Sequence, residues 1–231
     1  MYLGVGCHSR EVRKSNYFEN VKILKRKTRN NYNEINLKQN TMSEFKYYIM
    51  KKKSDQAYPL LRITGRDYSK GRQIKLVYLE FNSPIPRKPV MADFLSGSET
   101  IVSKRIADAM QQLNMDGVQF IPTKLTDTTG NVTEDYVCVV VKNNTYLALD
   151  KDKAKYRVDK DEDDEDDDIY NVSKVVLDRE VLGEIPLNKR LGFRLKEAPG
   201  YSLYHQSVVD VIMALEPTGV YFQDIEDYEL L

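Results

Sequence analysis

Apolar and polar residues alternate, or apolar residues run together, over several short stretches from residue 45 onward, as in β-strands. Aromatic and β-branched residues, which favour strands, are frequent in these stretches. The most apolar stretch, Tyr136–Val141, has no polar face and predicts a central strand buried on both sides. We interpret Cys138, within it, as a small core residue and not as a nucleophile. Further strands are predicted at 45–50, 59–63, 74–79, 169–177 and 191–195, with 146–149 as the hairpin partner of 136–141.

A helical period appears in two places that together form a repeat. Residues 101–120 and 203–222 align without a gap when one is shifted by 102 positions. In each copy, apolar residues spaced by three and four predict one apolar helix face, followed by a glycine turn and a short strand. The residues that are identical in the two copies are Asp108 and Asp210, Leu113 and Leu215, Gly117 and Gly219, Val118 and Val220, and Phe120 and Phe222.

Polar residues stand where the two predicted helices begin. Ser103 is a candidate N-cap, because its hydroxyl can accept a hydrogen bond from an N–H of the first turn. His205 takes the equivalent position in the second copy. We therefore expect His205 to have a capping or surface role and not to act as a general base.

These elements predict one α+β domain over residues 43–226, with a largely antiparallel or mixed sheet and a few short helices. Residues 1–41 differ in composition, with seven asparagines, no alanine or proline, and a net charge of +6. We interpret them as a disordered or non-native extension; the alternative is a basic arm for nucleic acid or an anionic membrane. Residues 227–231 form an acidic tail.

The formal net charge of zero over 231 residues conceals an acidic region, because residues 42–231 carry a net charge of −6. Such a region repels phosphate and favours a basic protein partner over nucleic acid. Eight consecutive acids within the predicted mobile loop 159–168 are candidate partner-binding residues: Asp161, Glu162, Asp163, Asp164, Glu165, Asp166, Asp167 and Asp168. The alternative is a solvated insertion without a role. The run lacks the glycine and ligand spacing of an EF-hand, so no specific metal site is expected.

The sequence contains no recognisable catalytic or cofactor motif. A glycine-rich phosphate loop, a G-x-S-x-G turn and an H-E-x-x-H pair are all missing, and the chain has two histidines. No apolar run approaches the roughly 20 residues of a membrane span. We therefore expect a non-enzymatic cytoplasmic protein with no cofactor, no metal, no nucleic-acid partner and no membrane partner.

The order and spacing of several short motifs resemble one known family. These motifs are Asp93-Phe-Leu, Ile101-Val-Ser-Lys-Arg-Ile-Ala-Asp, Asp116-Gly-Val-Gln-Phe-Ile-Pro, Tyr136-Val-Cys-Val-Val-Val, Ala148-Leu-Asp, Ile185-Pro-Leu and Gly192-Phe-Arg. Over roughly residues 45–225 the chain resembles the immunity-protein family of bacterial polymorphic-toxin systems first known from a myxobacterial domain of unknown function.

This resemblance implies a protein that binds a cognate toxin and blocks it without catalysis. If the toxin is a nuclease, its basic active face would suit an acidic immunity protein. The alternatives are a cytoplasmic adaptor or scaffold unrelated to toxins and a hydrolase without a readable motif.

Overall fold

The computed structural model describes residues 44–96, 99–143, 146–159 and 168–228. The chain divides into two units, Met1–Glu44 and Phe45–Leu231, and every helix and strand named below belongs to the second unit.

The larger sheet has seven strands and mixes parallel with antiparallel pairing. Its strands are β2 (Leu60–Tyr68), β3 (Ile74–Asn82), β4 (Phe94–Ser96), β5 (Thr100–Ser103), β6 (Val118–Thr126), β7 (Val132–Thr133) and β8 (Tyr136–Val141). Six of them follow the order β2-β3-β6-β8-β5-β4, and β7 pairs with β6 beside this path. β3 and β6 are parallel, whereas the other neighbours are antiparallel.

A second sheet of four antiparallel strands has the order β11-β12-β1-β13. These strands are β1 (Tyr47–Lys52), β11 (Gly192–Phe193), β12 (Leu203–His205) and β13 (Val220–Asp224). A separate hairpin pairs β9 (Lys155–Asp159) with β10 (Asp168–Lys174). The helices are α2 (Lys104–Gln111), α3 (Arg179–Glu184), α4 (Leu187–Arg190) and α5 (Gln206–Met213). The described part of the chain is therefore α+β with mixed and antiparallel sheets, as predicted.

The sequence repeat has a matching backbone in its two copies, which contain α2 and α5. Each helix is followed by a residue with positive φ, Asn114 or Glu216 (both +50°), and then by Gly117 (+76°) or Gly219 (+75°). Glycine adopts this conformation without the cost that a Cβ imposes. The predicted sequence of helix, glycine turn and strand is thus confirmed in both copies, and each copy also begins with a short strand, β5 or β12.

The equivalence extends beyond the repeated sequence to a whole group of strands. We call β5, α2, β6 and β8 the first half, and β12, α5, β13 and β1 the second half. In the first half β8 lies between β5 and β6, and in the second half β1 lies between β12 and β13. Tyr136 pairs with Ser103 as Tyr47 pairs with His205. The central strand follows its helix in the first half but precedes it by some 150 residues in the second. The two halves therefore share one layout with a different chain order.

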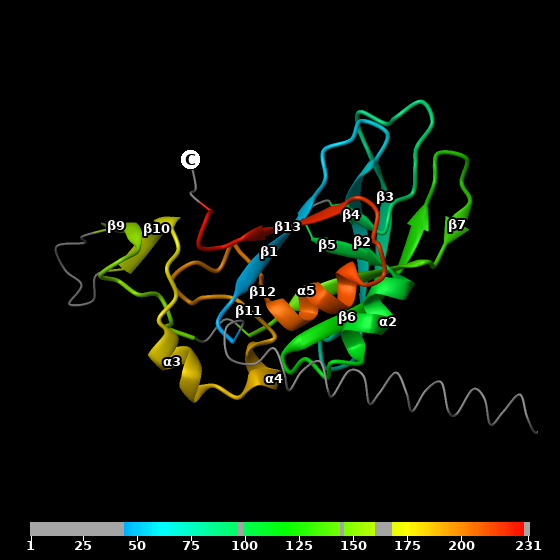
Figure 1. Cartoon of the computed structure of the whole chain (residues 1–231). Helices are drawn as coiled ribbons and strands as arrows, with labels where there is room; N and C mark the ends of the chain where they lie inside the picture. Colours follow the sequence, from blue (N-terminus) through cyan, green and yellow to red (C-terminus); the bar gives the residue numbers. More distant parts are fainter. Residues whose placement is uncertain (1–43, 97–98, 144–145, 160–167, 229–231) are drawn as a thin grey trace, which may run out of the picture. The chain divides into compact units, whose positions relative to one another are not determined.

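The two helices pack against each other and close one apolar core, and Figure 1 shows them side by side. This core contains Ile106 and Met110 of α2, Val208 and Ile212 of α5, and Val139 of β8. Helices of eight residues are marginal by themselves in water. We conclude that burial of these apolar faces stabilises α2 and α5.

The strand β8 confirms the prediction of a buried central strand. Four of its first five residues are buried, and Cys138 is 1% exposed. Its partners, however, are β5 and β6, so the predicted hairpin with residues 146–149 is wrong. Tyr146 instead bridges Leu195, and Leu149 bridges Leu177. Both contacts join segments that are distant in sequence, which local hairpin rules do not anticipate.

Candidate functional site

The predicted acidic run lies almost entirely outside the described residues. Residues 160–167 are not described, and Asp168 pairs with Asp159 at the end of the β9–β10 hairpin. Val172 of this hairpin is buried in an apolar core, with Tyr156 packed against it. The run therefore joins two strand ends of a hairpin that is anchored in the domain, and its binding role stays a prediction.

The two helix starts use their side chains differently. The imidazole Nδ1 of His205 accepts a hydrogen bond from the backbone N–H of Ser207 at 3.2 Å, so the predicted capping role of His205 is confirmed. Ser103 occupies the N-cap position of α2, but its side chain makes no capping hydrogen bond. Its hydroxyl donates to the Asp93 carboxylate at 2.8 Å instead, so the predicted cap by this hydroxyl is wrong.

Asp93 links the two copies of the repeat. Its carboxylate accepts hydrogen bonds from Ser103 and Arg105 beside and within α2, and from the backbone N–H and hydroxyl of Thr218 after α5. Arg105 also donates to the backbone carbonyl of Leu215 at 2.8 Å. Burial raises the pKa of Asp93, but the hydrogen bonds from Arg105, Thr218 and Ser103 outweigh it and hold the pKa well below its usual range. The donors to this carboxylate connect the start of α2 with the turn after α5, so we assign Asp93 a structural role.

The thiol of Cys138 has no features of a nucleophile. Burial raises its pKa to about 12, and the charge of Glu99 adds to the rise. A buried thiol of high pKa stays protonated and inert. Cys138 is therefore a core residue, as predicted. Among the described residues, no group of three or more His, Cys, Asp or Glu side chains is placed to hold a metal ion.

A polar cavity of about 400 Å³ lies where the two sheets meet. β1 pairs with β12 as far as Ile49, opposite Leu203, and then continues to Lys52 paired with β13 alone. The cavity adjoins this last part of β1 and is also lined by residues of β4, β5 and β12. Its volume is within the range of small-ligand sites, about 300–1,000 Å³.

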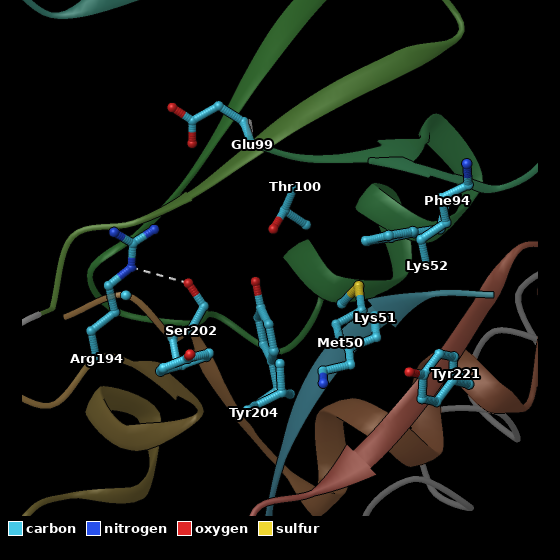
Figure 2. Close-up of a pocket in the computed structure, with 13 residues that line it drawn as sticks. Met50, Lys51, Lys52, Phe94, Glu99, Thr100, Arg194, Ser202, Tyr204 and Tyr221 are labelled. Carbon is cyan, nitrogen blue, oxygen red and sulfur yellow. Dashed lines mark hydrogen bonds between the residues drawn. The ribbon is translucent and has the colours of Figure 1, made fainter. Parts of the chain in front are cut away.

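The side chain of Tyr204 ends in this cavity. Figure 2 shows its ring rising between Ser202 and Met50, with the hydroxyl directed toward the space beside Thr100. Tyr204 is 1% exposed, yet its hydroxyl has no hydrogen-bond partner of normal geometry. Leaving a buried hydroxyl unpaired costs about 1–3 kcal/mol. Burial raises the pKa of Tyr204 to about 12, and weak hydrogen-bonding contacts with Thr100 and Ser202 oppose that rise, so the hydroxyl stays protonated at physiological pH. Because neither contact has the geometry of a full hydrogen bond, the hydroxyl can still donate to another acceptor.

Three cationic side chains and one carboxylate line the same cavity. The cations are Lys51, Lys52 and Arg194, and none of them forms an ion pair with a carboxylate in the described part of the chain. The carboxylate belongs to Glu99 and pairs with Arg66 at 3.2 Å. Arg194, held by Ser202, therefore brings a positive charge without a carboxylate partner to the cavity, although the region from residue 42 onward is acidic as a whole.

Sequence reasoning did not find this cavity, because its residues are far apart in the chain. Lys51 and Lys52 precede Tyr204 by about 150 positions, and neither flanks a recognisable motif. The one local signal was Arg194, which ends the motif Gly192-Phe-Arg. That motif identified the family and gave no indication of a binding site.

The described residues thus form an α+β protein with a polar, positively lined cavity and two copies of one structural unit. The chain belongs to the Immunity protein family (Imm11), whose sequence profile matches residues 17–227. The family predicted from the short motifs is confirmed, and the chain is an immunity protein. The match begins upstream of residue 42 and so includes part of the segment set apart by its composition. A search of curated proteins finds no match. Among the described residues, no helix is long and apolar enough to cross a membrane.

Proposed function

We propose that this protein neutralises a cognate bacterial toxin in the cytoplasm by direct, non-catalytic binding, as part of a polymorphic-toxin system. The observation that carries the proposal is the family match over residues 17–227. The chemistry of the described residues agrees with a binding role, because the one described cysteine is an inert core thiol and the described histidine caps a helix.

Co-expression tests the proposal in cells. The chain is expressed together with the toxin encoded beside its gene, and survival is compared with cells that express the toxin alone or the toxin with an unrelated protein of similar size. We expect survival with the chain only, together with co-purification of the two proteins. Cell death despite abundant folded chain would contradict the proposal, and capture of other proteins but not the toxin would favour an adaptor.

We further propose that the toxin presents a basic surface, as nucleases do, and that the acidic run Asp161–Asp168 attracts it. Opposite charges on two partners accelerate their encounter, and added salt weakens the effect. The support is the charge of the sequence: eight consecutive acids in a region whose net charge is −6.

A matched pair of variants separates this role from a general loss of charge. One variant carries Asp163→Ser, Asp164→Ser and Asp166→Ser; the control removes three exposed acids elsewhere, with Asp108→Asn, Glu184→Gln and Glu216→Gln. We expect the first variant to associate roughly tenfold more slowly at low salt and with a flatter salt dependence. Equal association rates for the two variants would remove the run from the mechanism.

A further inference from the structure

One end of the cavity between the two sheets is polar, because the hydroxyl groups of Tyr204, Thr100 and Ser202 gather there. Tyr204 supplies a buried hydroxyl that has no hydrogen bond of normal geometry, although the side chains of Thr100 and Ser202 lie close to it. Nearly all buried polar groups in folded proteins are paired, so an unpaired hydroxyl that faces a cavity indicates a site for another polar atom. The side chains of Thr100 and Ser202 stand on either side of it (Figure 2).

The three cations of the cavity differ in what they contact, and Arg194 is the one held beside the polar end. The Nε of Arg194 donates to the hydroxyl of Ser202 at 3.0 Å, which fixes the guanidinium but uses one of its five N–H donors. Lys52 donates to the carbonyl of Tyr58 at 3.1 Å, and the Nζ of Lys51 lies 3.7 Å from the centre of the Tyr228 ring. Lys51 and Lys52 therefore make their contacts away from the Tyr204 hydroxyl, and Arg194 is the cation that favours an anion beside it.

The remaining lining is apolar and selects among anions. Ile49 and Met50 of β1, Phe94 of β4 and Tyr221 of β13 contribute hydrocarbon or aromatic surface to the cavity. An inorganic phosphate would use the cations and hydroxyls alone. A carboxylate on a short hydrocarbon stem would use both parts, with its oxygens in the geometry that a guanidinium recognises. The carboxylate of Glu99 at the lining also disfavours a doubly charged anion over a singly charged one.

We propose that this cavity is a binding site for an aliphatic carboxylate. The carboxylate oxygens accept from Arg194 and the Tyr204 hydroxyl, and the hydrocarbon stem lies against Met50 and Phe94. Either a free organic acid or a glutamate side chain of the toxin would offer this chemistry. The inference stands on the cavity alone and does not require the proposed function.

Titration with butyrate, followed by amide NMR shifts of the full-length chain, tests the site. Butyramide, the uncharged analogue of the same shape, and inorganic phosphate are the comparison ligands. We expect saturable shifts at Thr100, Arg194 and Ser202 with butyrate, and affinities roughly tenfold lower for butyramide and for phosphate. The absence of saturable shifts up to about 50 mM butyrate, well above the affinity expected for six heavy atoms, would overturn the proposal. Equal affinity for butyramide or for phosphate would overturn it too.

Variants test whether the NMR shifts caused by butyrate arise from binding in the cavity. Arg194→Gln should weaken butyrate binding roughly tenfold, whereas Arg87→Gln, which changes an exposed arginine outside the cavity, should leave it unchanged. If Arg194→Gln does not fold, Tyr204→Phe, which removes the other proposed donor, provides the same comparison. Equal binding by the cavity variant and the Arg87→Gln control would contradict the assignment.

The two sources of the carboxylate are distinguished with the toxin. If a glutamate of the toxin enters the cavity, Arg194→Gln weakens toxin binding and butyrate competes with the toxin. If toxin binding is unaffected by both changes while butyrate still binds, the ligand is a free organic acid. A chain that binds butyrate but no toxin would refute the proposed function and leave the carboxylate site intact.

Discussion

Asp93 accepts hydrogen bonds from both copies of the repeat, and its side chain is only 10% exposed. Asp93→Asn removes the charge and keeps the size, so we expect a loss of about 2 kcal/mol in the free energy of unfolding. Part of the full cost of breaking a buried pair is avoided because the Arg105 side chain is 47% exposed. Asp108→Asn, at an exposed position on α2, should be nearly neutral. Urea unfolding measures the free energy of unfolding of each variant, and equal stability of the two variants would contradict the structural role of Asp93.

The same carboxylate predicts a pH dependence of stability. The pKa of Asp93 is lowered in the folded state, so folding favours its ionised form. Its contribution is therefore fully present above the unfolded-state pKa near 4 and is lost as the pH falls through the lowered folded-state pKa. We expect the difference in unfolding free energy between the native chain and Asp93→Asn to shrink as the pH decreases from 7 toward 3. A difference that stays constant over this range would mean that another interaction of Asp93 dominates.

Two buried tyrosine hydroxyls differ in whether they are paired. Tyr136 donates to the carbonyl of Ala92 at 2.9 Å, whereas Tyr204 has no partner of normal geometry. Tyr136→Phe should therefore cost about 1 kcal/mol of unfolding free energy, and Tyr204→Phe should be neutral or stabilising. Chemical denaturation compares the two directly. An equal loss in both variants would show that the Tyr204 hydroxyl is already satisfied within the protein.

The glycine that follows each repeated helix is required by its surroundings as well as by its backbone. A Cβ on Gly219 would lie 2.6 Å from the Cβ of Ala92 and 2.8 Å from the carbonyl oxygen of Phe94. Gly130 also has positive φ, but a Cβ there would meet nothing within 4 Å. We expect Gly219→Ala to cost about 3 kcal/mol and Gly130→Ala about 1 kcal/mol, the latter from the backbone alone. Similar thermal denaturation midpoints for the two variants would contradict this account of the close packing.

Sequence periodicity was a good guide to individual elements and a poor guide to their partners. The two helices, their glycine turns and the buried strand β8 follow from local patterns that report burial. The position of β1 in its sheet does not follow from local patterns, because β1 pairs with strands more than 150 residues away. The hairpin predicted for residues 146–149 failed for the same reason: its contacts to Leu195 and Leu177 are nonlocal.

The candidate site could be predicted even less well than the fold. A cavity is produced by the ends of several elements, and here it forms where β1 extends past β12. Lys51, Lys52 and Arg194 are ordinary polar residues in the sequence, and their lack of carboxylate partners becomes evident only in three dimensions. The acidic run, in contrast, is conspicuous in sequence and lies mostly outside the described residues.

The protein as a whole combines an acidic charge excess from residue 42 onward with a positively lined cavity, on a frame of two equivalent halves. Asp93 links the two halves by hydrogen bonds, and the helices α2 and α5 pack against each other across them.

Titration of the toxin's activity with the purified chain tests whether neutralisation occurs by binding. At toxin concentrations well above the dissociation constant, a non-catalytic inhibitor reduces activity linearly and reaches full inhibition at a fixed stoichiometric ratio. We predict this result, together with recovery of active toxin when the complex is denatured and the toxin refolded. Complete inhibition by a small fraction of an equivalent of the chain, with a toxin that stays inactive after separation, would instead show an enzyme that modifies the toxin.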